Sequence, residues 1–386
     1  MTMISKSLSL SSLSVILIKY SASLSRRPWW LSFVVWIALV SPAQAAMQLR
    51  VAIEQSAKVQ VGSSTDAIVR NSAGEKVGEI AAMNSFSAVP NRGNVALANW
   101  QSQQLWIEPS NDGYVWIDDR WYRGKTQLVP TGNGVTAINH VDLEQYLASV
   151  VGAEMIASWP QEALKAQAVA ARSYALYERS KSNNPLFDIG NTTGHQVYKG
   201  ITSETNTTQA AVAATSGQVM TYNGNIVLAA FHASSGGHTE NVEDVWVEPL
   251  PYLRGVPDFD QGNPSYQWTQ SFSGSELGRK ISGVGNVTAI APVKVTPNGR
   301  IEKVQIRGTQ GTRTMDGDAF RSALSLKSAL FTAVPTAGGF QLNGKGFGHG
   351  IGMSQWGAYN LASQGTNYQQ ILAHYYQNTT LAVLPR

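Results

Sequence analysis

The sequence predicts an α+β protein in three parts: a leader over residues 1–45, a small β-rich domain over 46–130, and a mixed β-rich domain with packed helices over 131–386. Short apolar stretches alternate with turn residues from Gln48 to about Lys125, which is typical of strands. A helical pattern runs from about Pro160 to Ser180. Asn223-Gly224 separates two strand-like runs and predicts a tight hairpin.

Residues 1–45 have the order of an export signal. They contain four basic residues and no acidic one, then an apolar run over residues 29–40, and they end in Ala43-Gln44-Ala45. We therefore predict export to the periplasm or cell wall, with cleavage after Ala45. The alternative is an uncleaved membrane anchor, although the apolar run is shorter than the about 20 residues that span a bilayer. Contact with a membrane is expected only in that case.

The charge balance argues against a nucleic-acid partner. The net charge is +4, but the leader holds four of the 29 basic residues, which leaves 25 basic and 25 acidic residues in the rest of the chain. A neutral chain has no basic field to attract phosphates. The sequence also contains no cysteine, which excludes disulfides, thiolate nucleophiles and zinc held by cysteine.

In the β-rich segment, Asn111-Asp112-Gly113 separates the strand-like runs 105–107 and 114–117, and predicts a second hairpin. Five aromatic residues of this segment could stack on sugars or fill a small β core, and the core role is favoured. These residues are Trp100, Trp106, Trp116, Trp121 and Tyr122.

In the mixed domain, Ser158 and Gln161 form a capping-box pattern at the start of the long helix. The small residues on one face of that helix predict close packing against another element. The other expected elements are strands at 135–141, 218–222, 225–231, 293–295 and 303–306, and helices at 143–151, at 207–216 with Gly217 as its C-cap, and from Ser354 onward.

Three segments combine polar groups with a permissive backbone: the stretch around Glu154, residues 232–238, and the glycine-dense residues 344–357. Small and apolar residues flank Glu154, and such surroundings raise the pKa of a carboxyl and suit it to act as a general acid. The alternative is an ion pair with Lys165 or Arg172. The residues alone leave both open.

Several long stretches occur together in one order. They are Tyr146 to Met155, Trp159 to Tyr174, Gln196-Val197-Tyr198-Lys199-Gly200, His232 to Glu240, Pro251-Tyr252-Leu253, Gly346 to Gly357 and His374-Tyr375-Tyr376. Over about residues 131–382 the chain thereby resembles the stage II sporulation protein D (SpoIID/LytB) family. The resemblance implies a lytic transglycosylase that cuts peptidoglycan glycan strands, stripped of stem peptides in some members, during cell-wall remodelling or sporulation. It implies one catalytic glutamate, which matches Glu154, and no cofactor. Relatives that bind zinc use cysteine ligands, so we predict no metal here.

Eleven further residues are predicted to bind substrate. They are Ser234, Ser235, Gly236, Gly237, His238, His349, Ser354, Gln355 and Trp356 in the two loops, and Lys165 and Arg172, seven residues apart on one helix face. A serine–histidine nucleophile in the 232–238 segment is an alternative, as is a core role for Trp356 and an ion-paired face for the two basic residues. Glu162, in the first turn of the long helix, is expected to be structural.

The expected partners are glycan strands, with a wall amidase or peptidase as a candidate protein partner. A second hypothesis is a non-catalytic module that binds the wall and enhances a separate amidase. A third is a serine-dependent wall peptidase or esterase, which the absence of a G-x-S-x-G elbow disfavours.

Overall fold

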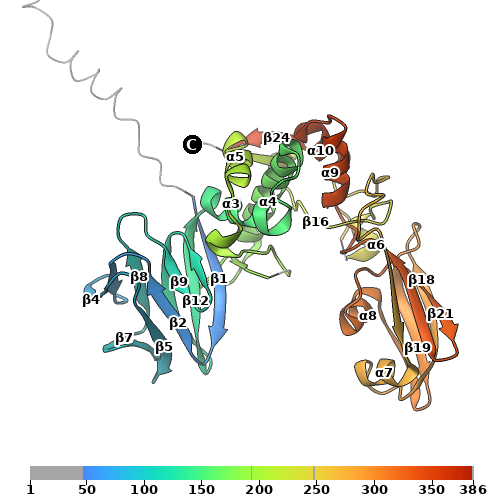
Figure 1. Ribbon diagram of the computed structural model, residues 1–386, viewed down its shortest axis with the longest axis horizontal. Helices are drawn as coiled ribbons and strands as arrows, with labels where there is room; N and C mark the ends of the chain where they lie inside the picture. The colour runs from blue at the N-terminus through green and yellow to red at the C-terminus, as the bar shows by residue number, and fades with distance from the viewer. Residues whose placement is uncertain (1–46, 193, 247, 385–386) are drawn as a thin grey trace, which may run out of the picture. The chain divides into compact units, whose positions relative to one another are not determined.

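The computed structural model describes residues 47–384, except 193 and 247. The predicted leader lies outside these residues. Within the described part of the chain, no helix is long and apolar enough to cross a membrane. The fold is mixed α and β, as predicted (Figure 1).

The first strands form two sheets. A seven-stranded sheet has the order β13-β1-β12-β11-β8-β3-β4, and a six-stranded sheet has the order β10-β9-β2-β5-β6-β7. The strands are β1 (Gln48–Ser56), β2 (Val59–Ser63), β3 (Ala67–Arg70), β4 (Lys76–Ile80), β5 (Ser85–Asn91), β6 (Asn94–Leu97), β7 (Trp100–Ser102), β8 (Leu105–Pro109), β9 (Val115–Ile117), β10 (Arg120–Tyr122), β11 (Lys125–Thr131), β12 (Gly134–Asp142) and β13 (Ile189–Gly190).

The hairpin predicted at Asn111-Asp112-Gly113 is wrong. The strand before this turn, β8, belongs to the seven-stranded sheet, and the strand after it, β9, belongs to the six-stranded sheet. Asn111 and Asp112 do have the positive φ angles of a tight turn, 51° and 54°. The turn therefore moves the chain from one sheet to the other, because β8 pairs with β3 and β11 instead.

The predicted boundary at residue 130 does not interrupt the core. β11 pairs with β12 across it, and β12 pairs with β1 from Gln48↔Asp142 to Ser56↔Val135. One cluster of buried hydrophobic residues extends from Leu49 to Tyr376. Strand 134–142 thus lies inside the seven-stranded sheet, and the helices that follow share its core.

α3 (Leu143–Glu154) begins directly after β12, where the Asp142 side chain accepts hydrogen bonds from two backbone N–H groups of the first turn. α4 (Gln161–Lys181) follows. Its predicted capping box is wrong: Pro160 is the N-cap, without a side-chain cap, and the Gln161 amide donates to Thr207 O instead. The small face of α4 packs against α3 and α5 (Asn206–Ala214), as predicted (Figure 1).

The hairpin at Asn223-Gly224 is confirmed. It joins β14 (Gln218–Tyr222) to β15 (Asn225–Ile226), and both turn residues have positive φ, 49° and 79°. β24 (Thr380–Val383) pairs with the other edge of β14. The predicted C-cap at Gly217 is wrong: α5 ends at Ala214 with Thr215 as its C-cap, and Gly217, with φ of 69°, lies two residues further on.

Residues 267–345 form an inserted region with its own hydrophobic core. It contains two three-stranded sheets, β17-β22-β21 and β18-β19-β20. Its elements are β17 (Gln267–Phe272), α7 (Gly274–Lys280), β18 (Val287–Val295), β19 (Ile301–Gly308), β20 (Gly311–Asp316), α8 (Gly317–Leu324), β21 (Phe331–Thr336) and β22 (Gly339–Lys345). The predicted strands at 293–295 and 303–306 lie within β18 and β19.

The segments before and after the inserted region lie side by side. β16 (Phe231–His232) pairs in parallel with β23 (Met353–Ser354), and Ser234 and Glu240 form bridges to Phe347 and Ile351. The 232–240 loop and the 346–354 loop, more than 100 residues apart in sequence, are thereby brought together.

Candidate active site

Glu154 is the last residue of α3 and is half-buried. Its Oε1 accepts a hydrogen bond from the Val197 N–H at 2.8 Å, and its Oε2 accepts one from the Gln355 amide at 3.4 Å. The carboxyl therefore joins three segments distant in sequence. The alternative of an ion pair with Lys165 or Arg172 is wrong, because Lys165 pairs with Glu162 and Arg172 with Glu144.

Burial raises the pKa of the Glu154 carboxyl above its ordinary value. The hydrogen bonds from Val197 and Gln355 and the charge of Lys199 act in the opposite direction and leave the pKa raised. A carboxyl with a raised pKa holds its proton closer to neutral pH, as a general acid requires. Sequence reasoning predicted this direction.

The segment that carries Val197 is itself fixed by buried hydrogen bonds. The Tyr146 hydroxyl donates to the Gln196 side-chain oxygen at 3.0 Å, and the Gln196 amide donates to Ala171 O at 3.1 Å. Both side chains are fully buried. The Val197 N–H is therefore held in place by α3 and α4 together.

Gln355 is the first residue of α9 (Gln355–Ser363). Ser354, where the sequence predicted the helix to open, is its N-cap, and the Ser354 hydroxyl accepts from Gly357 N–H. The next residue, Trp356, is half-buried and packs against Trp159, with ring centroids 4.6 Å apart. Tyr359 contacts both rings. Aromatic side chains thus lie next in sequence to Gln355 and shortly after Glu154, where a sugar ring could stack on them.

Comparisons with known proteins place these residues in a family. The model of the stage II sporulation protein SpoIID matches residues 131–222, and a domain of unknown function (DUF8618) matches residues 252–352. Stage II sporulation protein D of Bacillus subtilis is 33% identical over 271 residues, which are 64% of this chain and 76% of that protein.

This chain belongs to the stage II sporulation protein D family. The resemblance predicted from the motifs is confirmed.

Two other relatives are similar over much of the chain. An uncharacterized protein of Brachyspira hyodysenteriae is 34% identical over 280 residues, 70% of this chain and 75% of that protein. The amidase enhancer of Bacillus subtilis is 32% identical over 293 residues, 61% of this chain and 40% of that protein. Glu154 and Val197 lie within the SpoIID match, whereas Gln355 lies beyond both matched segments.

Within this SpoIID chain, the predicted substrate contacts of Ser234 and Ser235 do not fit the structure. Both serines are fully buried, and their hydroxyls donate to the carboxylates of Asp260 at 2.5 Å and Asp258 at 2.6 Å. The same bonds disfavour a serine–histidine nucleophile, because each hydroxyl donates its proton to an aspartate carboxylate and not to a histidine. The sequence analysis did not identify Asp258 and Asp260 as the partners of these serines.

The other predicted substrate contacts in the 232–240 loop are two glycines and His238. Gly236 and Gly237 have positive φ, 86° and 111°, and the Gly236 N–H donates to the Asp260 carboxylate. His238 donates from Nδ1 to Thr239 O at 2.6 Å and stays partly exposed. Of these three residues, His238 is the one with a partly exposed side chain that carries polar atoms.

His349 holds the loops together as a neutral ring. Its Nδ1 accepts from Ile351 N–H and its Nε2 donates to Phe231 O, each at 3.0 Å. Burial lowers its pKa to about 3. Both ring nitrogens are occupied, so the predicted sugar contact of His349 does not fit. Ser354 is fully buried as the N-cap of α9, whereas its neighbour Gln355 contacts Glu154.

Arg172 is also misplaced for a substrate contact. Its side chain is fully buried and binds both Glu144 oxygens, at 2.8 and 2.6 Å. Lys165 is a quarter exposed and pairs with Glu162 at 2.7 Å. Glu162 also accepts from Tyr368 N–H, which confirms its structural role. The two basic residues lie seven positions apart and so on one face of α4, but this face is buried at Arg172 and partly exposed at Lys165.

The described residues contain no group of three or more His, Cys, Asp or Glu side chains arranged to hold a metal ion. The positions that sequence reasoning passed over are Gln196, the Val197 N–H and Lys199. These residues belong to the Gln196 to Gly200 stretch, which contributed to the family resemblance but to which the sequence analysis assigned no chemical role.

Proposed function

We propose that this protein is an exported lytic transglycosylase of peptidoglycan in which Glu154 acts first as the acid and then as the base. The observation that carries the proposal is the Glu154 carboxyl itself: half-buried, raised in pKa, and bound by one backbone N–H and one amide. Membership of the SpoIID family supports it.

A hydrolase would need a second carboxyl, about 5 to 10 Å from the first, to act on water or on the sugar carbon. The acids at positions 240, 243 and 244, in and just before the short helix α6 (Val242–Val245), have other partners. Glu240 is buried beside Arg300, Glu243 pairs with Arg254 at 2.7 Å, and Asp244 accepts from the Asn241 amide. In a transglycosylase the substrate supplies the nucleophile, so one carboxyl suffices.

In the proposed reaction, protonated Glu154 donates its proton to the departing glycosidic oxygen as the bond to C1 breaks. The resulting carboxylate then takes the proton of the muramyl C6 hydroxyl as that oxygen attacks C1. The products are a free hydroxyl on the leaving strand and a 1,6-anhydromuramyl end on the other. Glu154 returns to its protonated form without water being consumed.

The test is digestion of purified glycan strands, with the products read by mass spectrometry. Wild-type protein should form ends that lack one water relative to reducing ends, and Glu154→Gln should bind strands without cutting them. Glu162→Gln, a carboxyl change on the neighbouring helix, is the matched control and should cut normally. Reducing ends throughout, or full activity of Glu154→Gln, would refute the proposal. Digesting intact and stem-stripped wall in parallel shows which substrate is preferred.

A second candidate function is enhancement of a separate wall amidase, and the 32% identity to an amidase enhancer favours it. Under that hypothesis the protein alone leaves glycan strands intact and accelerates an added amidase. Glu154→Gln would then enhance the amidase as well as wild type does, which separates the two functions.

A further inference from the structure

Arg300 links the inserted region to both loops of the site. It directly precedes β19, and its side chain is buried, with 1% of the residue exposed. Its Nη1 donates to Gly348 O and its Nη2 donates to Ser235 O, each at 3.3 Å. One guanidinium therefore binds a carbonyl of the 346–354 loop and a carbonyl of the 232–240 loop.

Glu240 completes this contact. It is 1% exposed, and its Oε1 lies 3.6 Å from Arg300 Nε. The same carboxylate accepts from Thr296 Oγ1 and Asn298 Nδ2, each at 3.1 Å. The turn at residues 296–300 thus binds the 232–240 loop through a buried ion pair as well as through the guanidinium. A buried charge that loses its partner is strongly unfavourable, so the contact favours one arrangement.

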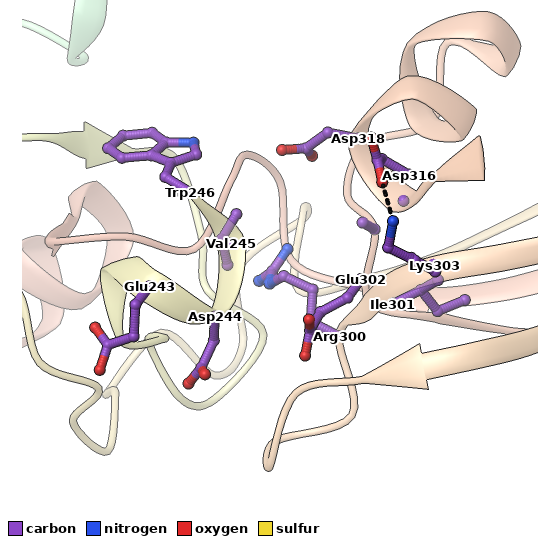
Figure 2. Close-up of a pocket in the computed structure, with 12 residues that line it drawn as sticks. Glu243, Asp244, Val245, Trp246, Arg300, Ile301, Glu302, Lys303, Asp316 and Asp318 are labelled. Carbon is purple, nitrogen blue, oxygen red and sulfur yellow. Dashed lines mark ion pairs between the residues drawn. The ribbon is translucent and has the colours of Figure 1, made fainter. Parts of the chain in front are cut away.

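The neighbourhood of Arg300 indicates that hydrogen bonds set its position. A hollow of about 150 Å³ lies beside it, lined by residues 243–246, at the end of the short helix α6, and by residues of the inserted region (Figure 2). Packing therefore does not enclose the guanidinium on that side. A Cβ added at Gly350 would lie 2.4 Å from Nη2, so glycine at position 350 allows the 346–354 loop to approach Arg300 this closely.

The arrangement of the two loops determines where Gln355 lies. Phe231 and His232 pair with Met353 and Ser354, and the next contact is Trp356 N–H to Ala233 O at 3.0 Å. Gln355 lies between these contacts and donates to Glu154. A shift of one loop along the other would move this amide away from the carboxyl.

We infer that Arg300 is a positioning residue, through which the inserted region clamps the 232–240 and 346–354 loops together and holds Gln355 against Glu154. This gives a role to the region matched by the domain of unknown function. The catalytic consequence rests on the proposed function, whereas the clamp itself does not.

The test compares two changes at the clamp with a control. Arg300→Lys keeps the charge but replaces the planar fork with a single ammonium, which cannot reach both carbonyls in the same way. Arg300→Met combined with Glu240→Gln removes both charges, so that neither is left buried and unpaired. Arg313→Met changes an exposed arginine of the inserted region and should leave every measurement unchanged.

Hydrogen exchange of the full-length protein measures how firmly the two loops are held together, independently of activity. In both clamp variants the amides of Phe347 and Trp356, which bond across the loops, should exchange at least tenfold faster than in wild type. Amides of β1 and β12 should keep their protection. On glycan strands kcat should fall by about 10²-fold, the cost of a misplaced catalytic geometry, with KM within about threefold.

Wild-type exchange of the loop amides in Arg300→Lys and in the double variant would overturn the inference. So would a raised KM with unchanged kcat, which would instead make Arg300 a substrate contact. If β1 and β12 lose protection in the double variant, that protein has unfolded and Arg300→Lys decides. If wild type fails to cut strands, the proposed function fails, and the exchange result still decides whether the clamp exists.

Discussion

Removing either partner of the buried Arg172–Glu144 pair is expected to destabilise the fold, and by unequal amounts. Arg172 is fully buried on α4, whereas the Glu144 side chain on α3 is 32% exposed. The guanidinium also donates to Gln218 O, so it joins two helices to β14. The pair is therefore a structural link, and not the substrate contact that the sequence predicted for Arg172.

The magnitudes follow from which charge remains. Breaking a buried pair by removing one partner costs about 3 to 5 kcal/mol. Arg172→Met leaves Glu144, which water can reach, so we expect the lower end, about 3 kcal/mol. Glu144→Leu leaves a fully buried guanidinium, so we expect the upper end, about 5 kcal/mol. The double variant should recover most of the loss, because two apolar side chains leave no unpaired charge.

Urea unfolding of the purified variants, followed by tryptophan fluorescence, measures these free energies. Glycan-strand binding of the same samples is the parallel assay. If both single variants lose less than about 1 kcal/mol while binding is abolished, the structural interpretation is refuted and Arg172 contacts substrate after all. Equal losses in the two single variants would contradict the burial argument.

Three further predictions concern the site. Gln355→Leu removes a hydrogen bond that lowers the pKa of Glu154, so the alkaline limb of the activity profile should move to higher pH while kcat falls about tenfold. Gly350→Ala should cost about 1 to 3 kcal/mol in thermal unfolding, because φ is +86° and the new Cβ meets Arg300. The half-buried, neutral His349 has a pKa lowered to about 3, so between about pH 6.5 and 3 the unfolded chain binds a proton at this ring that the folded chain does not bind. The free energy of unfolding should therefore fall as pH drops from about 6.5 toward 3, by at most about 1.4 kcal/mol per unit for this ring, in a pH series of urea titrations.

Local patterns predicted the elements whose causes are local. The Asn223-Gly224 hairpin, helix α5 and the small face of α4 all follow from backbone preferences and residue size within a few positions. The prediction failed where a distant partner decided the outcome. Asn111 and Asp112 make their turn, but β8 pairs with β3 and β11 and not with β9. Gln161 bonds to Thr207 O in place of its own helix end.

The candidate site divides in the same way. The residues around Glu154 sufficed to predict a carboxyl with a raised pKa and, through its motifs, the family. They could not show that the Val197 N–H and the Gln355 amide bind the two carboxyl oxygens, because these groups come from segments 43 and 201 residues away.

Tertiary structure also decided which polar residues are free to meet a ligand. Ser234, His349 and Arg172 have side chains suited to sugars, yet each already has a hydrogen-bond partner from a distant segment. The chemistry of a side chain follows from the sequence, whereas its partner depends on which segments the fold brings within hydrogen-bond distance.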